Sequence, residues 1–199
     1  MSVKKVSTRI RQEQITRAAL EVISSEGVQG LTTANIARRA GISEANLYRH
    51  FENKEAILKD LVERVEKALV ENVKRMASLP LPPLEKLERI FKLHVSHIEA
   101  NRGIPRVIFS SEAFFVREIK EGLGEFISRY LGLLKDVLKE GVRDGSVRSD
   151  VRPEVLANMC ISMIQFTVLR WMLSDYGFSL EKRAGVLWRS YSKMIGARR

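Results

Sequence analysis

The sequence has little cysteine and no long apolar run. Cys160 is the one cysteine among 199 residues, which excludes an intrachain disulfide and a zinc site built from several thiolates. No uninterrupted apolar stretch reaches the roughly 18 residues that a membrane-spanning helix needs, and the basic, polar start of the chain lacks the apolar centre of a signal peptide. We therefore expect a cytoplasmic protein that has no membrane as a partner.

The sequence also lacks the motifs of the common enzyme classes, because it has no nucleophile elbow, P-loop or dinucleotide fingerprint. His94 and His97 stand three residues apart on an expected helix, a spacing that leaves an acid–base pair or a metal site open. A metal site of this kind takes about three or four protein ligands, and neither Glu99 nor Glu112 is obviously placed to help. We expect no enzyme, no cofactor and no metal, and a polar pair at a pocket edge or on the surface.

Acidic residues are the minority charge. Lysine and arginine number 34 against 24 aspartates and glutamates, a formal net charge of +10 with neutral histidines. Such an excess is typical of proteins that bind a polyanion, and nucleic acid is the leading partner, although charge alone fits a merely basic protein equally well. With 45% hydrophobic and 29% charged residues, the chain has the composition of a globular protein.

Helical periodicity runs along the whole chain, and no segment alternates as a strand would. The run from Leu79 to Pro83 must break the pattern, because proline lacks an amide hydrogen. The expected fold class is all-α, with a three-helix helix-turn-helix domain at 1–53 and a helical bundle for effector binding and dimerisation at 54–199. The expected helices cover about residues 8–26, 32–41, 43–51, 53–76, 84–100, 105–115, 116–144, 153–176 and 180–195.

Residues 31–54 form the most informative stretch, two short helices joined by a turn. On the second helix, Leu47 and Phe51 lie one turn apart and are expected to face the core. At about 100° per residue, Ala45 and Arg49 then point almost directly away from Leu47. That outward strip could enter the major groove of DNA, although short helix-turn-helix units also occur in proteins that never touch DNA.

The residue types on this strip suit contact with DNA. Arg49 can pair with guanine or a phosphate, Asn46 with the edge of adenine, and the Ala45 methyl with the thymine methyl. Ser43 is expected to cap the helix and to leave its first amides facing phosphate. Contacts to the DNA backbone are expected from Thr32, Thr33, Tyr48, His50 and Lys54. A flexible basic arm could be added by Lys4, Lys5, Arg9 and Arg11.

The pattern TxxIAxxAGxSxxxLYxxFxxK resembles the TetR family of one-component regulators. It is read here at Thr33, Ile36, Ala37, Ala40, Gly41, Ser43, Leu47, Tyr48, Phe51 and Lys54. The resemblance implies a nine- or ten-helix fold, a dimer interface made by two C-terminal helices, and a pocket in the effector domain. It also implies repression that is relieved when a small molecule binds. Glu44 departs from the basic or small residues common in the family; it could accept from a cytosine amine, or merely stabilise the helix.

The last two expected helices carry more apolar residues than one buried face requires. A partner chain would explain this, because two such pairs make a four-helix bundle that sets two recognition helices about 34 Å apart on a palindromic operator. An intrachain core is the alternative for each residue. The residues concerned are Leu156, Met159, Cys160, Met163, Ile164, Val168, Leu169, Met172, Val186, Leu187, Tyr191 and Met194.

A pocket is expected between the helices at 84–100, 116–144 and 153–176. Its residues predict a small, mainly apolar effector with a few polar contacts, although aromatic and methionine residues at helical spacing are more often ordinary core. The ligand-binding residues expected here are Phe91, His94, Phe109, Phe126, Gln165 and Phe166, and further lining residues are Ile98, Phe114, Tyr130 and Trp171.

Overall fold

A computed structural model describes residues 7–197, so that Lys4 and Lys5 of the expected basic arm lie outside the described residues. Within this range the chain forms ten α-helices and one short 3-10 helix, and its only β pairing is an isolated bridge between Val147 and Gly196. The helices are α1 (Thr8–Glu26), α2 (Thr33–Ala40), α3 (Glu44–Tyr48), α4 (Lys54–Ala77), α5 (Pro83–Ala100), α6 (Gly103–Ile108), α7 (Ser111–Phe115), α8 (Arg117–Arg143), α9 (Pro153–Leu173) and α10 (Leu180–Ile195), with η1 at Val28–Gly30. The all-α fold is confirmed.

Most helix ends fall where local capping predicts. Ser7, Thr32 and Ser43 accept a hydrogen bond from the amide three residues ahead and so begin α1, α2 and α3. Gly41 ends α2 with φ 67° and ψ 35°, a left-handed conformation that glycine adopts without a steric penalty. The helix break at the proline run is also present, and α5 begins at Pro83.

The helix expected at 105–115 is wrong, because two short helices, α6 and α7, replace it. Ser110 separates them. Its hydroxyl donates to the carbonyl of Val107 at 2.8 Å, and its oxygen caps α7 by accepting from the amide of Ala113. The side chain thus competes with the continuing helix for backbone groups, as serine does in turns.

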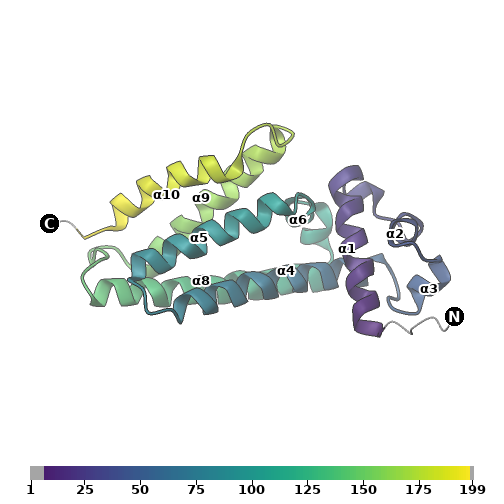
Figure 1. Ribbon diagram of the computed structural model, residues 1–199, viewed down its shortest axis with the longest axis horizontal. Helices are drawn as coiled ribbons and strands as arrows, with labels where there is room; N and C mark the ends of the chain where they lie inside the picture. Colours follow the sequence, from purple (N-terminus) through teal and green to yellow (C-terminus); the bar gives the residue numbers. More distant parts are fainter. Residues whose placement is uncertain (1–6, 198–199) are drawn as a thin grey trace. The chain divides into compact units, whose positions relative to one another are not determined.

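The described chain divides into two compact units. The first contains the residues up to Val65 together with Asn101–Leu123, and so α6 and α7 pack with the N-terminal helices (Figure 1). The division into domains 1–53 and 54–199 stays a prediction. The core of this unit includes Ile15, Ala19, Ile23, Ile36, Leu47, Ile57, Leu61, Val107, Ala113 and Ile119, all at most 3% exposed.

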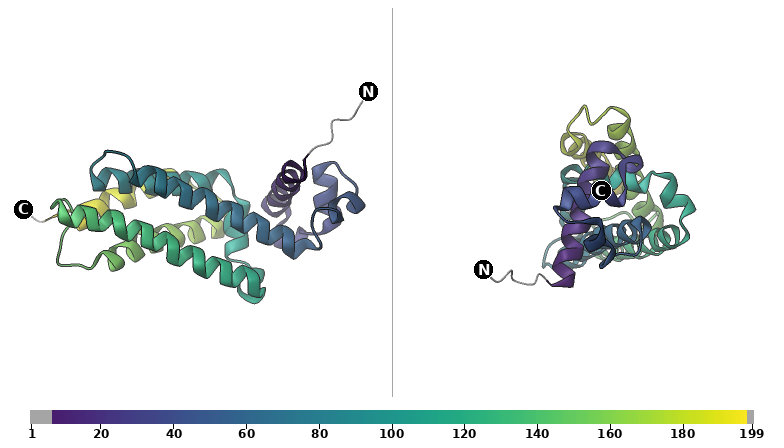
Figure 2. Two further views of the ribbon diagram at one scale, coloured as in Figure 1. Left: turned by 90° about the horizontal axis from the view of Figure 1, so that it is seen from below. Right: turned by 90° about the vertical axis from the view of Figure 1, so that its right-hand side faces the viewer.

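The second unit contains Glu66–Ala100 and the residues from Gly124 onward. Figures 1 and 2 show α10 beside α9 and α5, which agrees with the residue contacts among these helices. Tyr191 of α10 donates its hydroxyl to the carbonyl of Leu156 in α9 at 2.7 Å. Glu99 of α5 accepts from the amides of Leu180 and Glu181, so its carboxylate satisfies the N-terminus of α10.

The helix α9 is the most apolar part of the second unit. Its 21 residues contain a window of mean hydropathy 1.3, and the helix is long and apolar enough to cross a membrane. The sequence has no uninterrupted apolar run of that length, so this helix was not expected to pass such a test. The core helix of a folded bundle passes the same test. One face of α9, with Ile164, Val168 and Trp171, is buried in the unit, whereas Phe166 is 64% and Leu173 77% exposed.

Candidate nucleic-acid interface

The short helix α3 is held against the first unit by two side chains. Leu47 is fully buried and Phe51 is 7% exposed, as their one-turn spacing predicts. The helix ends at Tyr48 rather than at residue 51, and the amide of His50 donates to the carbonyl of Leu47, three residues back, as in the tighter turn of a helix end. The buried Leu47 contributes about 1.5 to 3 kcal/mol of transfer free energy and fixes the rotation of α3.

The outward strip of α3 is open to solvent. Ala45, Tyr48 and Arg49 are exposed and Asn46 is half-buried, so the structure brings the four expected base- and phosphate-contacting groups to one surface. Ser43 at the start of the helix is exposed as well. A convex strip that carries a guanidinium, an amide and a methyl has the chemistry that reads base edges in a major groove.

Two hydrogen bonds link α2 to this strip. The hydroxyl of Thr33 donates to Oε2 of Glu44 at 3.0 Å, and the same hydroxyl lies 3.3 Å from the Tyr48 hydroxyl. Glu44 is exposed but engaged, which the sequence did not predict because the contact depends on how α2 crosses α3. Thr32, the other threonine expected at the DNA backbone, is exposed and caps α2.

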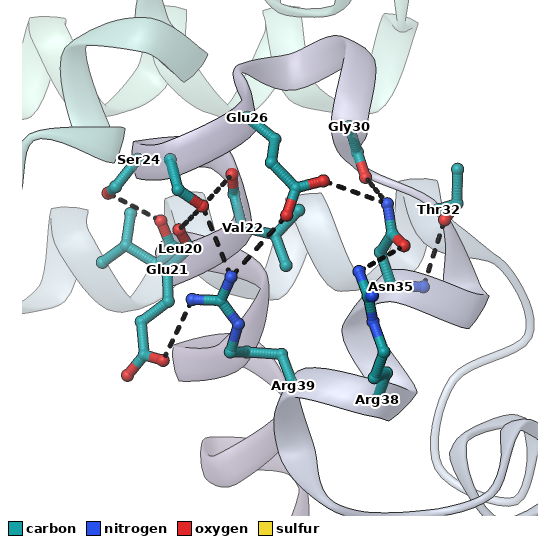
Figure 3. Close-up of polar contacts among 11 residues, drawn as sticks. Leu20, Glu21, Val22, Ser24, Glu26, Gly30, Thr32, Asn35, Arg38 and Arg39 are labelled. Atoms are coloured by element: carbon teal, nitrogen blue, oxygen red, sulfur yellow. Dashed lines mark hydrogen bonds and ion pairs between the residues drawn. The ribbon is translucent and has the colours of Figure 1, made fainter.

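The helix α2 is fixed to the end of α1 by a polar network (Figure 3). Its Asn35 donates its side-chain amide to Glu26 at 3.2 Å and to the carbonyl of Gly30 at 2.9 Å. Its Arg39 lies between Glu21 and Glu26, with N···O distances of 3.9 and 3.6 Å. The exposed ion pairs each contribute little, but the two bonds of Asn35 give α2 a defined position.

Arg38 is a cation that the sequence reasoning missed. It is exposed on α2 and donates to Oδ1 of Asn35 at 3.0 Å, so its position is set by the same network (Figure 3). Arg38 and Arg39 are adjacent in the sequence, and nothing there distinguishes their roles. The structure shows that Arg39 faces two carboxylates, whereas Arg38 bonds to an amide oxygen.

The remaining expected DNA contacts lie around α3 and α4. His50 is half-buried and its carbonyl accepts from Gln12 of α1 at 3.3 Å. Lys54 is exposed at the start of α4, and its positive charge favours the ionised form of Glu112 in α7. Partial burial alone would raise the pKa of Glu112, but hydrogen bonds from its own amide, Ser110 and Ser111, together with Lys54, lower it. The basic side chains Arg9 and Arg11 of the expected arm lie within α1.

The expected ligand residues do not form one cluster. Phe91 and His94 are buried in the second unit, Phe126 and Gln165 are half-buried there, and Phe166 is largely exposed. The half-buried Phe109 belongs to the first unit.

His94 and Tyr130 form a buried polar pair between α5 and α8. Nδ1 of His94 lies 2.9 Å from the Tyr130 hydroxyl, and the ring of Phe126 lies 5.5 Å from that of Tyr130. Burial, aided by the nearby charge of His97, lowers the pKa of His94 to about 4. Burial also raises the pKa of the Tyr130 phenol, so a neutral imidazole meets a protonated phenol at neutral pH. Such a pair can offer a hydrogen bond in an otherwise apolar interior.

A separate hollow of about 320 Å³ lies between α5 and α10. Of the expected ligand residues it includes only Phe91. Its lining consists of Phe91, Lys92, Leu93, Val95, Ser96, Glu181, Ala184 and Gly185.

The two carboxylates considered beside the histidine pair are placed elsewhere. Glu99 caps α10, and Glu112 belongs to the first unit. Among residues 7–197, no three histidine, cysteine, aspartate or glutamate side chains are grouped to hold an ion.

Two sequence profiles match the chain. Residues 15–61 match "Bacterial regulatory proteins, tetR family", and residues 80–175 match "Tetracyclin repressor-like, C-terminal domain". The first match contains α2 and α3, and the second contains α5 to α9, so both units are represented.

Several proteins resemble the chain over almost its full length. The nucleoid occlusion factor SlmA of Vibrio campbellii is 27% identical over 188 residues, which cover 93% of this chain and 95% of SlmA. The fold matches the fatty acid degradation regulator FadR of Bacillus halodurans, with TM-score 0.81, 22% identity, and 95% and 97% of the two chains covered. It also matches FadR of Bacillus subtilis, solved in complex with stearoyl-CoA, with TM-score 0.77, 24% identity, and 90% and 97% covered. The chain belongs to the TetR family and is a non-enzymatic, DNA-binding transcriptional regulator.

Proposed function

We propose that the chain is a repressor that binds a palindromic operator as a homodimer and is released by a small, mainly apolar effector. The observation that carries the proposal is the orientation of α3, with Leu47 buried and Ala45 and Arg49 exposed. Base contacts come from Arg49, Asn46 and Ala45. Contacts to the DNA backbone come from Thr32, Thr33, Ser43, Tyr48, His50 and Lys54.

Homodimerisation is supported by the apolar surface of the last two helices. These helices expose Val155, Phe166, Leu173, Val186 and Met194, each at least 37% accessible. Large side chains of this kind are covered in a stable assembly, and a twofold axis through α9 and α10 pairs each helix with its own copy. The assembly then presents two copies of α3 to half-sites about one turn, or 34 Å, apart. Such a regulator acts in the cytoplasm, where its DNA is.

The effector is proposed to enter the second unit near His94, Phe91, Phe126 and Gln165. The neutral imidazole of His94 and the Tyr130 hydroxyl supply a polar contact among apolar side chains. One fold relative was solved with stearoyl-CoA, a ligand with a long apolar chain. Acyl-CoA is therefore the first effector class to test.

The experiment combines selection of randomised DNA with competition binding. The full chain is expected to enrich a palindrome and to prefer it over bulk DNA by about a thousandfold or more at physiological salt. Stearoyl-CoA is then titrated into the complex, and release at a stoichiometry of one or two per dimer is expected. Equal loss of affinity for all sequences as salt rises would indicate a charge-only binder and refute the proposal.

Binding of an operator that no acyl-CoA releases would refute only the effector class. Stearate and free CoA serve as the two controls, because they separate recognition of the apolar chain from recognition of the phosphorylated head.

A further inference from the structure

In the contact between α2 and α3, the number of hydroxyl hydrogens decides which group donates and which accepts. The Thr33 hydroxyl carries one hydrogen, and it donates that hydrogen to the Glu44 carboxylate at 3.0 Å. In the 3.3 Å contact with Tyr48, Thr33 is then the acceptor and the Tyr48 hydroxyl the donor. The chain of bonds runs from Tyr48 to Thr33 and ends on Glu44, which orients this carboxylate on the flank of α3 that faces α2, beside the outward strip.

The carboxylate keeps most of its capacity to accept hydrogen bonds. Within residues 7–197, Thr33 is its one hydrogen-bond partner, and no lysine or arginine there forms a salt bridge with it. An ionised carboxylate accepts through both oxygens and has about four lone-pair positions. Glu44 is exposed, so the remaining positions are open to a donor that approaches the strip.

We propose, on the basis of the proposed operator binding, that Glu44 is a specificity-determining residue that selects cytosine at one position of each half-site. Thr33 acts as its positioning residue. The carboxylate disfavours phosphate and acceptor-bearing base edges, and so it weakens binding to unrelated DNA while it admits one base.

The edges of the four bases explain why cytosine is selected. In the major groove, guanine presents two acceptors and thymine presents an acceptor and a methyl, and all of these acceptors repel a carboxylate. Adenine presents an amine beside the acceptor N7, whereas cytosine presents its N4 amine as the sole polar group. A group that only accepts therefore pairs best with cytosine.

The test compares the DNA preferences of the full chain and four variants by selection, followed by competition binding with single base-pair changes. E44Q replaces the carboxylate with an amide that both donates and accepts, and an amide pairs with N6 and N7 of adenine. We expect E44Q to switch the preference at one position of each half-site from cytosine to adenine, by about five- to tenfold. E44A should remove the preference there and strengthen binding to unrelated DNA.

Two further variants separate position from charge. T33V removes the hydroxyl that orients the carboxylate and should reduce discrimination at the same base pair only partly. E52Q is the matched control, because Glu52 is an exposed carboxylate just beyond α3 and its loss changes the net charge equally. E52Q should leave every base preference unchanged.

Identical sequences selected by the wild type, E44Q and E44A would overturn the role of Glu44, even if the variants melt at lower temperature. If the wild-type protein selects an operator and E44Q selects the same one, the proposed function still stands. Wild-type protein that selects no sequence refutes the proposed function, and the role of Glu44 with it.

Discussion

Gly103 at the start of α6 touches Leu20 of α1 so closely that a Cβ built on Gly103 would lie 2.8 Å from the Leu20 carbonyl oxygen. The same Cβ would meet the Leu20 side chain at 2.6 Å and the Ser24 hydroxyl at 2.8 Å. The backbone oxygen cannot move aside cheaply, so this glycine is what lets α6 pack directly on α1.

Replacement of Gly103 by alanine should therefore destabilise the first unit by about 1 to 3 kcal/mol, the usual cost of overpacking. Gly122 is the control, because a Cβ on it meets nothing within 4 Å and alanine there should stabilise α8 by up to about 1 kcal/mol. Urea denaturation followed by circular dichroism measures both. Equal stability of the two variants would show that α6 can withdraw from α1 at no cost.

Loss of the Arg49 side chain should weaken operator binding. If Arg49 contacts a base edge, Arg49→Ala costs about 1 to 3 kcal/mol and relaxes the preference at that base pair. Fluorescence anisotropy with labelled operator measures the change. Arg17→Ala removes the same charge from an exposed residue of α1 that pairs with Glu21, and it should cost much less. Unchanged affinity in the Arg49 variant, with an intact fold, would remove Arg49 from the interface.

The Tyr48 hydroxyl is expected to act without regard to sequence. In the free protein the hydrogen of this hydroxyl is donated to Thr33. If that hydrogen turns to a phosphate when DNA binds, Tyr48→Phe should weaken binding to all DNA sequences by about 1 to 2 kcal/mol. Competition binding against a panel of operators with single replacements is the measurement. A loss confined to one base pair would contradict a phosphate contact.

A charge placed on the exposed face of α9 should prevent dimerisation. Phe166→Glu would bury a carboxylate without a partner at the proposed interface, at a cost of roughly 3 kcal/mol or more. Sedimentation equilibrium should show a monomer with weakened binding to the palindrome. Phe115→Glu is the control, since Phe115 is 86% exposed on α7, outside the last two helices. A dimer that survives the change at Phe166 would place the interface elsewhere.

The stability of the protein should fall with acid because of His94. Its folded pKa of about 4 lies below the ordinary value of 6.5, so the unfolded chain binds the proton more readily between these two values. Stability is therefore complete above pH 6.5 and declines toward pH 4, by about 3 kcal/mol from this residue alone. His94→Gln should remove most of that slope in urea titrations at several pH values. A slope that stays the same in this variant would assign the effect to other groups.

Local signals in the sequence were enough to predict the cap at Ser43 and the burial of Leu47, because each depends on residues within about one helical turn. The outward position of Arg49 follows from the same periodicity. The break at Ser110 was missed, because the apolar spacing continues across it and the competing side-chain bonds leave no trace in periodicity. The bond from Thr33 to Glu44 was out of reach for a different reason, since it joins two helices whose crossing is set by tertiary packing.

The effector residues were the least predictable part. The spacing of Phe91, His94 and Phe166 predicts only that each lies on an apolar or amphipathic face of a helix. Whether such a face meets a core, a cavity or solvent depends on the neighbouring helices. Phe166 and Phe91 read alike in the sequence, yet one is 64% and the other 2% exposed.

The packing of α6 and α7 within the first unit limits where the chain can be divided into transferable domains. Val107, Ala113 and Ile119 cover the same apolar cluster as Ile15 and Leu47. A chimera that joins residues 1–53 to a foreign sensor domain would lack these three side chains, together with Ile57 and Leu61, and would leave the cluster open to water. A transfer of the DNA-binding unit to another protein therefore has to include the distant segment Asn101–Leu123 as well. The DNA-binding helices and the start of the sensor domain can only be exchanged as one piece.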